Sequence, residues 1–149
     1  MARGLAALAV LARLAVAAVF LAAALPKIAD PAGFVADLRN YQVFPHWSWT
    51  AIAGLVPMLE VVGAVALVIG WKRRAAAVLL GLLTTSFLIL IGSVIARGID
   101  LQCGCFGRDA AAESIGWPLF LRDVGLLALV GLAGREVPGV GAARAGDVR

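Results

Sequence analysis

The uncharged stretch AAAVLLGLLTTSFLILIGSVIA, residues 75–96, decides the fold of this chain. A helix crosses a bilayer core about 30 Å thick with about 20 apolar residues, and this stretch supplies them. Residues 5–25, 50–70 and 117–134 form three further apolar runs, of which the last is the shortest and most polar. The sequence therefore predicts four membrane-spanning helices. The first run is longer than the apolar part of most signal peptides, which favours a retained helix.

The composition excludes several classes of protein. Of the 149 residues, 62% are hydrophobic and 15% are charged, and the mean hydropathy is +0.98. A soluble domain has about 45–50% apolar and about 25% charged residues, and a disordered chain is poorer still in apolar groups. We therefore expect one membrane domain over residues 1–136, followed by a disordered cytoplasmic tail over residues 137–149 that is rich in Gly, Ala and Arg.

The basic residues lie at the ends of the apolar runs, so they report topology rather than nucleic-acid binding, and we expect no nucleic-acid partner. With the N-terminus in the cytoplasm, seven Lys and Arg residues lie on that side and four on the other. The cytoplasmic set is Arg3, Lys72, Arg73, Arg74, Arg135, Arg144 and Arg149, and the outer set is Lys27, Arg39, Arg97 and Arg108. The positive-inside rule then places both termini in the cytoplasm and residues 26–49 and 97–116 outside it.

The predicted fold is all-α, a polytopic up-down-up-down bundle of four membrane helices with a short interfacial helix in the first outer loop. Asp30 followed by Pro31 has the pattern of an N-cap and first helical residue. A helix from there to Tyr41 places Phe34 and Leu38 on the same side as Tyr41. Tryptophans that follow this segment fit an interfacial aromatic belt.

The two cysteines, Cys103 and Cys105, are separated by one residue in the second outer loop. A disulfide closing so small a ring gains little loop-closure entropy, roughly 1.6 kcal/mol, and its geometry is poor. Strained disulfides are easily reduced and tend to be catalytic, so the pair is best interpreted as redox-active. A structural disulfide remains an alternative. So does copper(I) bound by two thiolates, but a closed zinc site lacks ligands.

Ionisable residues inside the predicted spans are candidate functional groups, because an unpaired charge in the membrane is costly. Glu60 and Arg13 have matching depths, so they can pair. The alternative partners of a protonated Glu60 are hydroxyl groups of the next span, at Thr84, Thr85 or Ser86. Pro57, one turn before Glu60, predicts a kink and with it a cavity for a polar ligand head group.

Cations near the cysteines would favour the reactive thiolate. Lys27 lies at an outer helix end, and Arg122 lies about 8 Å into the last span. Arg122 and Asp123 are adjacent and point to different helix faces, so we do not expect them to pair. Arg122 facing the bundle could reach Asp100 or a quinone carbonyl.

Four motifs in this chain resemble the MauE branch of the DoxX-like membrane proteins. They are LPKIADPAGFVADLRNYQVFP at residues 25–45, LEVVGAVALVIG at 59–70, CGCFG at 103–107 and FLRDVGLL at 120–127. The resemblance covers residues 5–134, and CGCFG together with KIADPAGF is its most specific part. Asp123 stands where an asparagine is expected, which leaves the role of that position in doubt.

The resemblance implies a protein of a bacterial cytoplasmic membrane that makes or moves disulfides together with a thioredoxin-fold partner on the extracytoplasmic side. It makes Cys103 and Cys105 the redox pair, and Lys27, Glu60 and Arg122 match polar positions of the family pattern. Our leading hypothesis is a thiol–disulfide oxidoreductase that exchanges electrons with a quinone, ubiquinone or menaquinone, near those polar residues. The alternatives are a non-catalytic anchor or assembly factor of a redox complex, or a copper-handling protein.

Overall fold

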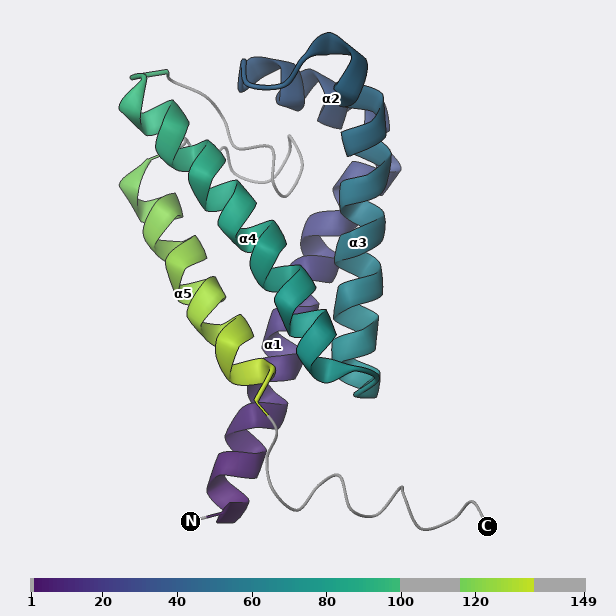
Figure 1. The fold of residues 1–149 in the computed structure, drawn as a ribbon, viewed down its shortest axis with the longest axis vertical. Helices are drawn as coiled ribbons and strands as arrows, with labels where there is room; N and C mark the ends of the chain where they lie inside the picture. The colour runs from purple at the N-terminus through teal and green to yellow at the C-terminus, as the bar shows by residue number, and fades with distance from the viewer. Residues whose placement is uncertain (1, 100–115, 136–149) are drawn as a thin grey trace.

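The computed structural model describes residues 2–99 and 116–135, with side chains from residue 7 onward, and these residues are almost entirely helical (Figure 1). Four long helices, one short helix and a single 3₁₀ turn make up the described chain, which contains no β-strand. They are α1 (Ala2–Ala29), α2 (Pro31–Asn40), η1 (His46–Ser48), α3 (Trp49–Ile69), α4 (Arg73–Ala96) and α5 (Trp117–Ala133). The predicted all-α class is confirmed.

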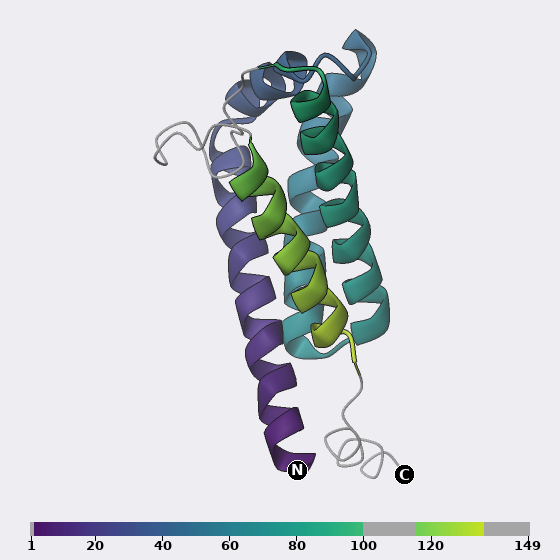
Figure 2. The same ribbon diagram turned by 90° about the vertical axis from the view of Figure 1, so that its left-hand side faces the viewer.

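The long helices form an antiparallel ring in the order α1, α3, α4, α5, and α5 packs back against α1. Chain direction alternates around the ring, so the α3–α4 turn and the end of α5 lie at the same end as the N-terminus (Figures 1 and 2). The ends of α1 and α4, the start of α5 and the whole of α2 lie at the opposite end, called here the α2 end. This arrangement is the predicted up-down-up-down bundle.

Three helical segments are long and apolar enough to cross a membrane, judged by length and composition alone. They are Ala7–Ala29, His46–Ile69 and Arg73–Ala96. Helix α5 has 17 residues, which is the lower limit of the range of about 17–25 for a crossing helix. Large aliphatic side chains such as Leu82 and Ile89 are exposed on the outer face of the bundle, as the lipid phase favours.

The half of the bundle away from α2 is tightly packed, because small side chains let the helices approach closely. At Gly63 an added Cβ atom would lie 2.6 Å from Cδ2 of Leu80, so the Leu80 side chain of α4 packs directly on the α3 backbone there. The buried cluster in this half is drawn from all four long helices. It comprises Ala12, Val16, Ala17, Phe20, Ala64, Leu67, Ala76, Ala77, Leu80, Val130 and Ala133.

Arg13 closes this packed half by binding the end of α5, and the predicted pair with Glu60 is wrong. Its Nε donates to the carbonyl of Ala133 and its Nη2 to the carbonyl of Arg135, each at 3.0 Å. The last carbonyls of a helix have no partner within the helix. The buried guanidinium satisfies them and offsets the negative end of the helix dipole.

Helix α2 is amphipathic and covers the end of the bundle, as predicted. The Asp30 side chain accepts a hydrogen bond from the Gly33 amide at 2.9 Å, and Pro31 occupies the first turn. Phe34, Leu38 and Tyr41 are buried beneath the helix. Trp47 just beyond it is 82% exposed, where an interfacial aromatic ring is favourable.

Substitution of Gly134 tests the close approach of α5 to α4. An added Cβ atom would lie 2.6 Å from the Ala77 Cβ, a contact that neither methyl group can relieve by rotation. We expect Gly134→Ala to lower the free energy of unfolding in detergent by about 1–3 kcal/mol. Gly131→Ala, three residues earlier where an added Cβ meets nothing within 4 Å, is the matched control. Equal stability of the two variants would contradict this packing.

Candidate functional site

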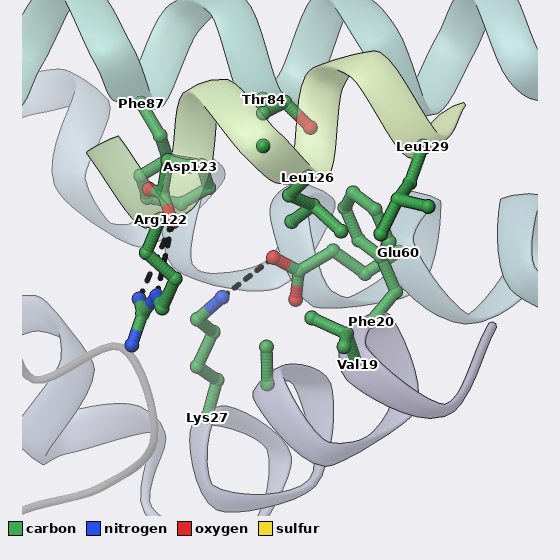
Figure 3. Close-up of a pocket in the computed structure, with 12 residues that line it drawn as sticks. Val19, Phe20, Lys27, Glu60, Thr84, Phe87, Arg122, Asp123, Leu126 and Leu129 are labelled. Atoms are coloured by element: carbon green, nitrogen blue, oxygen red, sulfur yellow. Dashed lines mark hydrogen bonds and ion pairs between the residues drawn. The ribbon is translucent and has the colours of Figure 1, made fainter. Parts of the chain in front are cut away.

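A buried ion pair joins α1 to α3 near the α2 end. The Lys27 Nζ lies 2.6 Å from the Glu60 Oε1, and the two side chains are 3% and 1% exposed (Figure 3). The short distance is typical of a charge-assisted hydrogen bond. Lys27 lies in the last turn of α1, at a helix end as expected, but its side chain is buried in the bundle.

Two aromatic rings share the stabilisation of the Lys27 ammonium. Its Nζ lies 5.4 Å from the ring centroid of Phe34 on α2 and 5.1 Å from that of Phe87 on α4. A cation over the face of an aromatic ring is attracted by the ring's quadrupole, and the attraction grows where water is excluded. One side chain of α1 is thus held by α2, α3 and α4 together.

A cavity of about 380 Å³ lies beside this ion pair, enclosed by all four long helices. The volume falls within the range of small-molecule sites, about 300–1,000 Å³. Most of its lining is apolar, and the polar groups gather toward the α2 end. The lining residues are Val19, Phe20, Ala23, Lys27, Glu60, Thr84, Phe87, Arg122, Asp123, Gly125, Leu126 and Leu129.

The cavity brings together three residues that the sequence marked as functional, namely Lys27, Glu60 and Arg122. They come from three different helices, and Figure 3 shows them around one space. The Thr84 hydroxyl also faces this region, but it donates to the Leu80 carbonyl at 2.9 Å within its own helix. Thr85 and Ser86 bond in the same way, so the predicted hydroxyl partners of Glu60 are wrong.

The lining between α1 and α5 is the least covered part of the cavity. Val19 on α1 is 36% exposed and Leu129 on α5 is 39% exposed. Between them, the Cβ position of Gly125 has no neighbouring atom within 4 Å. The cavity is therefore least shielded from the outer surface of the bundle along α1 and α5.

Arg122 and Asp123 form an ion pair at the α2 end of the cavity. The Nε and Nη2 of Arg122 each lie 3.3 Å from the Asp123 Oδ1, and Arg122 is 39% exposed. The prediction that these neighbours do not pair is wrong, because the long arginine side chain reaches back over the adjacent carboxylate. Asp123 was not predicted as a site residue, since its spacing in the sequence gives no sign that it faces the cavity.

Tyr41 joins α2 to the end of α4 above the cavity. The Nη2 of Arg97 donates to its backbone carbonyl at 2.7 Å. Burial, and after it the negative charges of Asp37 and Asp123, raise the pKa of the Tyr41 phenol to about 12. The phenol therefore stays protonated at any physiological pH.

The predicted redox pair, Cys103 and Cys105, lies outside the described residues, as do Asp100 and the predicted tail. The segment that contains both cysteines connects α4 to α5. Its two described flanks, Ile99 and Gly116, are at the α2 end (Figure 1). Lys27 of the cavity lining lies in the last turn of α1, at this same end. Cys103 follows Ile99 by four positions in the sequence.

Comparison with known proteins gives the family. The sequence profile described as methylamine utilisation protein MauE matches residues 5–135, which is most of the chain. This chain belongs to the MauE family. The match spans the five α-helices and the segment with both cysteines, and it covers the residues of the ion pair and of the cavity.

Individual MauE proteins are about one-third identical to this chain. The methylamine utilization protein MauE of Paracoccus denitrificans is 33% identical over 118 residues, which is 78% of this chain and 63% of the relative. That of Methylophilus methylotrophus is 34% identical over 126 residues, covering 84% of this chain and 65% of the relative. The chain thus spans less than two thirds of the length of these relatives. No solved structure shows significant similarity to it.

The ion pair can be tested with a double-mutant cycle of Lys27→Met and Glu60→Gln. Each single variant leaves a buried charge without its partner, which costs about 3–5 kcal/mol. The double variant removes both charges, so we expect it to be more stable than either single variant. The free energy of unfolding in detergent measures this, and a double variant whose loss equals the sum of the two single losses would contradict the pairing.

Tyr41 is the single tyrosine of the chain, so the phenolate absorbance reports it alone. We expect a titration midpoint near 12 in the folded protein, against about 10 for a free tyrosine. Because the unfolded chain ionises first, the stability contributed by the buried phenol is complete below pH 10 and is lost as the pH rises through 12. Tyr41→Phe removes the absorbance change, and an ordinary midpoint in the folded wild type would disprove the burial.

Proposed function

We propose that this MauE-family membrane protein is a thiol–disulfide oxidoreductase that passes electrons between Cys103–Cys105 and a quinone held in the cavity. The supporting observation is the cavity itself, which has charged residues, apolar walls and partly exposed lining residues on α1 and α5. Lys27 of its lining lies in the last turn of α1, at the same end of the bundle as the flanks of the cysteine segment. The names of the relatives place those proteins in methylamine utilisation, and we extend no substrate from them to this chain.

The thiol chemistry needs no further group from the protein. A thiolate of a thioredoxin-fold partner attacks one sulfur of the Cys103–Cys105 disulfide, which breaks the S–S bond and forms a mixed disulfide. The second partner thiolate then releases the dithiol form of this chain and leaves the partner oxidised. Return to the disulfide requires the loss of two electrons and two protons from the dithiol.

A quinone matches the shape and polarity of the cavity. Its isoprenoid tail can lie against the apolar lining residues, which include Leu126 and Leu129. The tail can then leave the cavity between α1 and α5, where Val19 and Leu129 are partly exposed. A ring carbonyl can accept a hydrogen bond from Lys27, whose ammonium has three donors and gives one to Glu60. When bound, the quinone accepts the two electrons and two protons released as the disulfide forms.

The orientation that this function requires follows the distribution of basic residues. The α3–α4 turn carries Lys72, Arg73 and Arg74, and the positive-inside rule places it in the cytoplasm. The α2 end, and with it the cysteine segment, then faces the outside of a bacterial cytoplasmic membrane, where disulfides persist. Both termini are cytoplasmic in this proposal.

Quinone reduction by the reconstituted chain tests the proposal. Liposomes containing the full chain and decylubiquinone receive reduced bacterial thioredoxin as the thiol donor, and the loss of quinone absorbance is followed. We expect turnover by the wild type. Cys103→Ser, Cys105→Ser and the double variant should fall to the rate of empty liposomes, because a single thiol cannot form the internal disulfide.

Gly131→Ala, on the lipid face of α5, is the matched control and should retain the wild-type rate. Retention of that rate by the double cysteine variant would refute the oxidoreductase proposal and favour a non-catalytic membrane anchor. Copper bound in a 1:1 ratio and lost on mutation of either cysteine, in a chain without turnover, would instead indicate a copper-handling protein.

A further inference from the structure

The second carboxylate oxygen of Glu60 has no hydrogen-bond partner among the described residues. Oε1 bonds to Lys27, but Oε2 is buried and unpaired in a side chain that is 1% exposed. Figure 3 shows this oxygen turned away from the contact with Lys27, within the space that the lining residues surround. A buried acceptor without a donor costs about 1–3 kcal/mol or more, so a ligand that supplies the donor gains that energy.

The chemistry of the missing partner follows from the two groups that face it. A carboxylate oxygen accepts hydrogen bonds and donates none, while the Lys27 ammonium only donates. A ligand carbonyl can accept a hydrogen bond from Lys27, but it has no hydrogen to donate to Oε2, so the two acceptor oxygens repel each other. A ligand hydroxyl can accept from Lys27 and donate to Oε2 through one oxygen atom, so it satisfies both groups.

We propose that the Lys27–Glu60 pair recognises a hydroxyl head group, so that the cavity binds a hydroquinone more tightly than the corresponding quinone. This inference rests on the proposed function, which needs a quinone site but does not say which redox form the site prefers. The preference comes from Glu60 Oε2, an oxygen that accepts no hydrogen bond from any described residue.

The preference shifts the midpoint potential of the bound quinone. A site that binds the reduced form tenfold more tightly raises the midpoint potential of the bound two-electron couple by about 30 mV. The bound quinone is then a stronger oxidant than quinone free in the membrane. The dithiol of Cys103 and Cys105 gives up two electrons and two protons as its S–S bond forms, and the quinone becomes hydroquinone. The preference therefore favours the internal step in which the dithiol reduces the bound quinone, while the net direction is set by the potentials of the thiol partner and of the free quinone.

Binding of the two redox forms tests this inference. Full-length protein in nanodiscs is titrated with decylubiquinone and, under anaerobic conditions, with decylubiquinol, and the two dissociation constants are compared. We expect at least a tenfold preference of the wild type for the quinol. Glu60→Gln replaces an acceptor by an amide whose NH₂ group donates, so the preference should disappear or reverse.

Two further variants keep the result interpretable. Lys27→Met combined with Glu60→Gln leaves no unpaired buried charge, and it should also lose the quinol preference. Thr85→Val removes a hydroxyl that is exposed on the outer face of α4 and bonded to the Gly81 carbonyl, and it should keep the wild-type ratio. Thr85 lies next to the cavity-lining Thr84 but does not line the cavity itself.

The outcomes separate this inference from the proposed function. Wild-type protein that binds both forms equally, or the quinone more tightly, overturns the hydroxyl recognition but leaves the quinone site intact. The same holds if Glu60→Gln keeps the quinol preference. Wild-type protein that binds neither form overturns both the quinone site and this inference, whatever the cysteine variants show.

Discussion

The arrangement of the α2 end depends on one buried ion pair between Lys27 and Glu60. Each charge would be costly alone in so apolar a setting, and the attraction between them offsets that cost only with close geometry. The 2.6 Å contact and the two aromatic rings over the ammonium provide it. Because these partners come from α1, α2, α3 and α4, the pair fixes the position of α2 and keeps the first three long helices in register.

The two halves of the bundle have different roles for a reason visible in their side chains. Away from α2, alanine and glycine bring the helices together, and Arg13 binds the end of α5. Toward α2, the charged pair and large aromatic rings take the place of small residues, and the helices enclose a cavity instead of a packed core. In the proposed function, the first half supplies rigidity and the second supplies the site.

Hydropathy predicted the long helices and their order, because lipid demands long apolar runs. The amphipathic α2 was predicted from its cap at Asp30 and Pro31. The partner of Glu60 could not be predicted in this way. Matching depths assumed that α1 and α3 end at one level, but Lys27 lies only two residues before the end of α1, whereas Glu60 lies eleven residues, about 16 Å, into α3. Helix α1 ends below the start of α3, and α2 lies over the end of α1 (Figure 1). This difference in level between the two helix ends depends on tertiary packing and has no local sequence signal.

In the proposed function, this difference in level brings the polar end of the cavity toward the end of the bundle from which the cysteine segment begins. Two residues of rise place Lys27 about 3 Å from the end of α1, so the polar end of the cavity is near the surface of the bundle that α2 covers. Arg122 and Asp123 lie at the same level, between the cavity and the start of α5. A ligand head group bound to Lys27 and Glu60 is therefore held toward the end where the chain leaves α4 for Cys103. Had Glu60 paired with Arg13, fourteen residues or about 21 Å further down α1, a head group at that depth would lie toward the opposite end of the bundle, where Arg13 binds the end of α5.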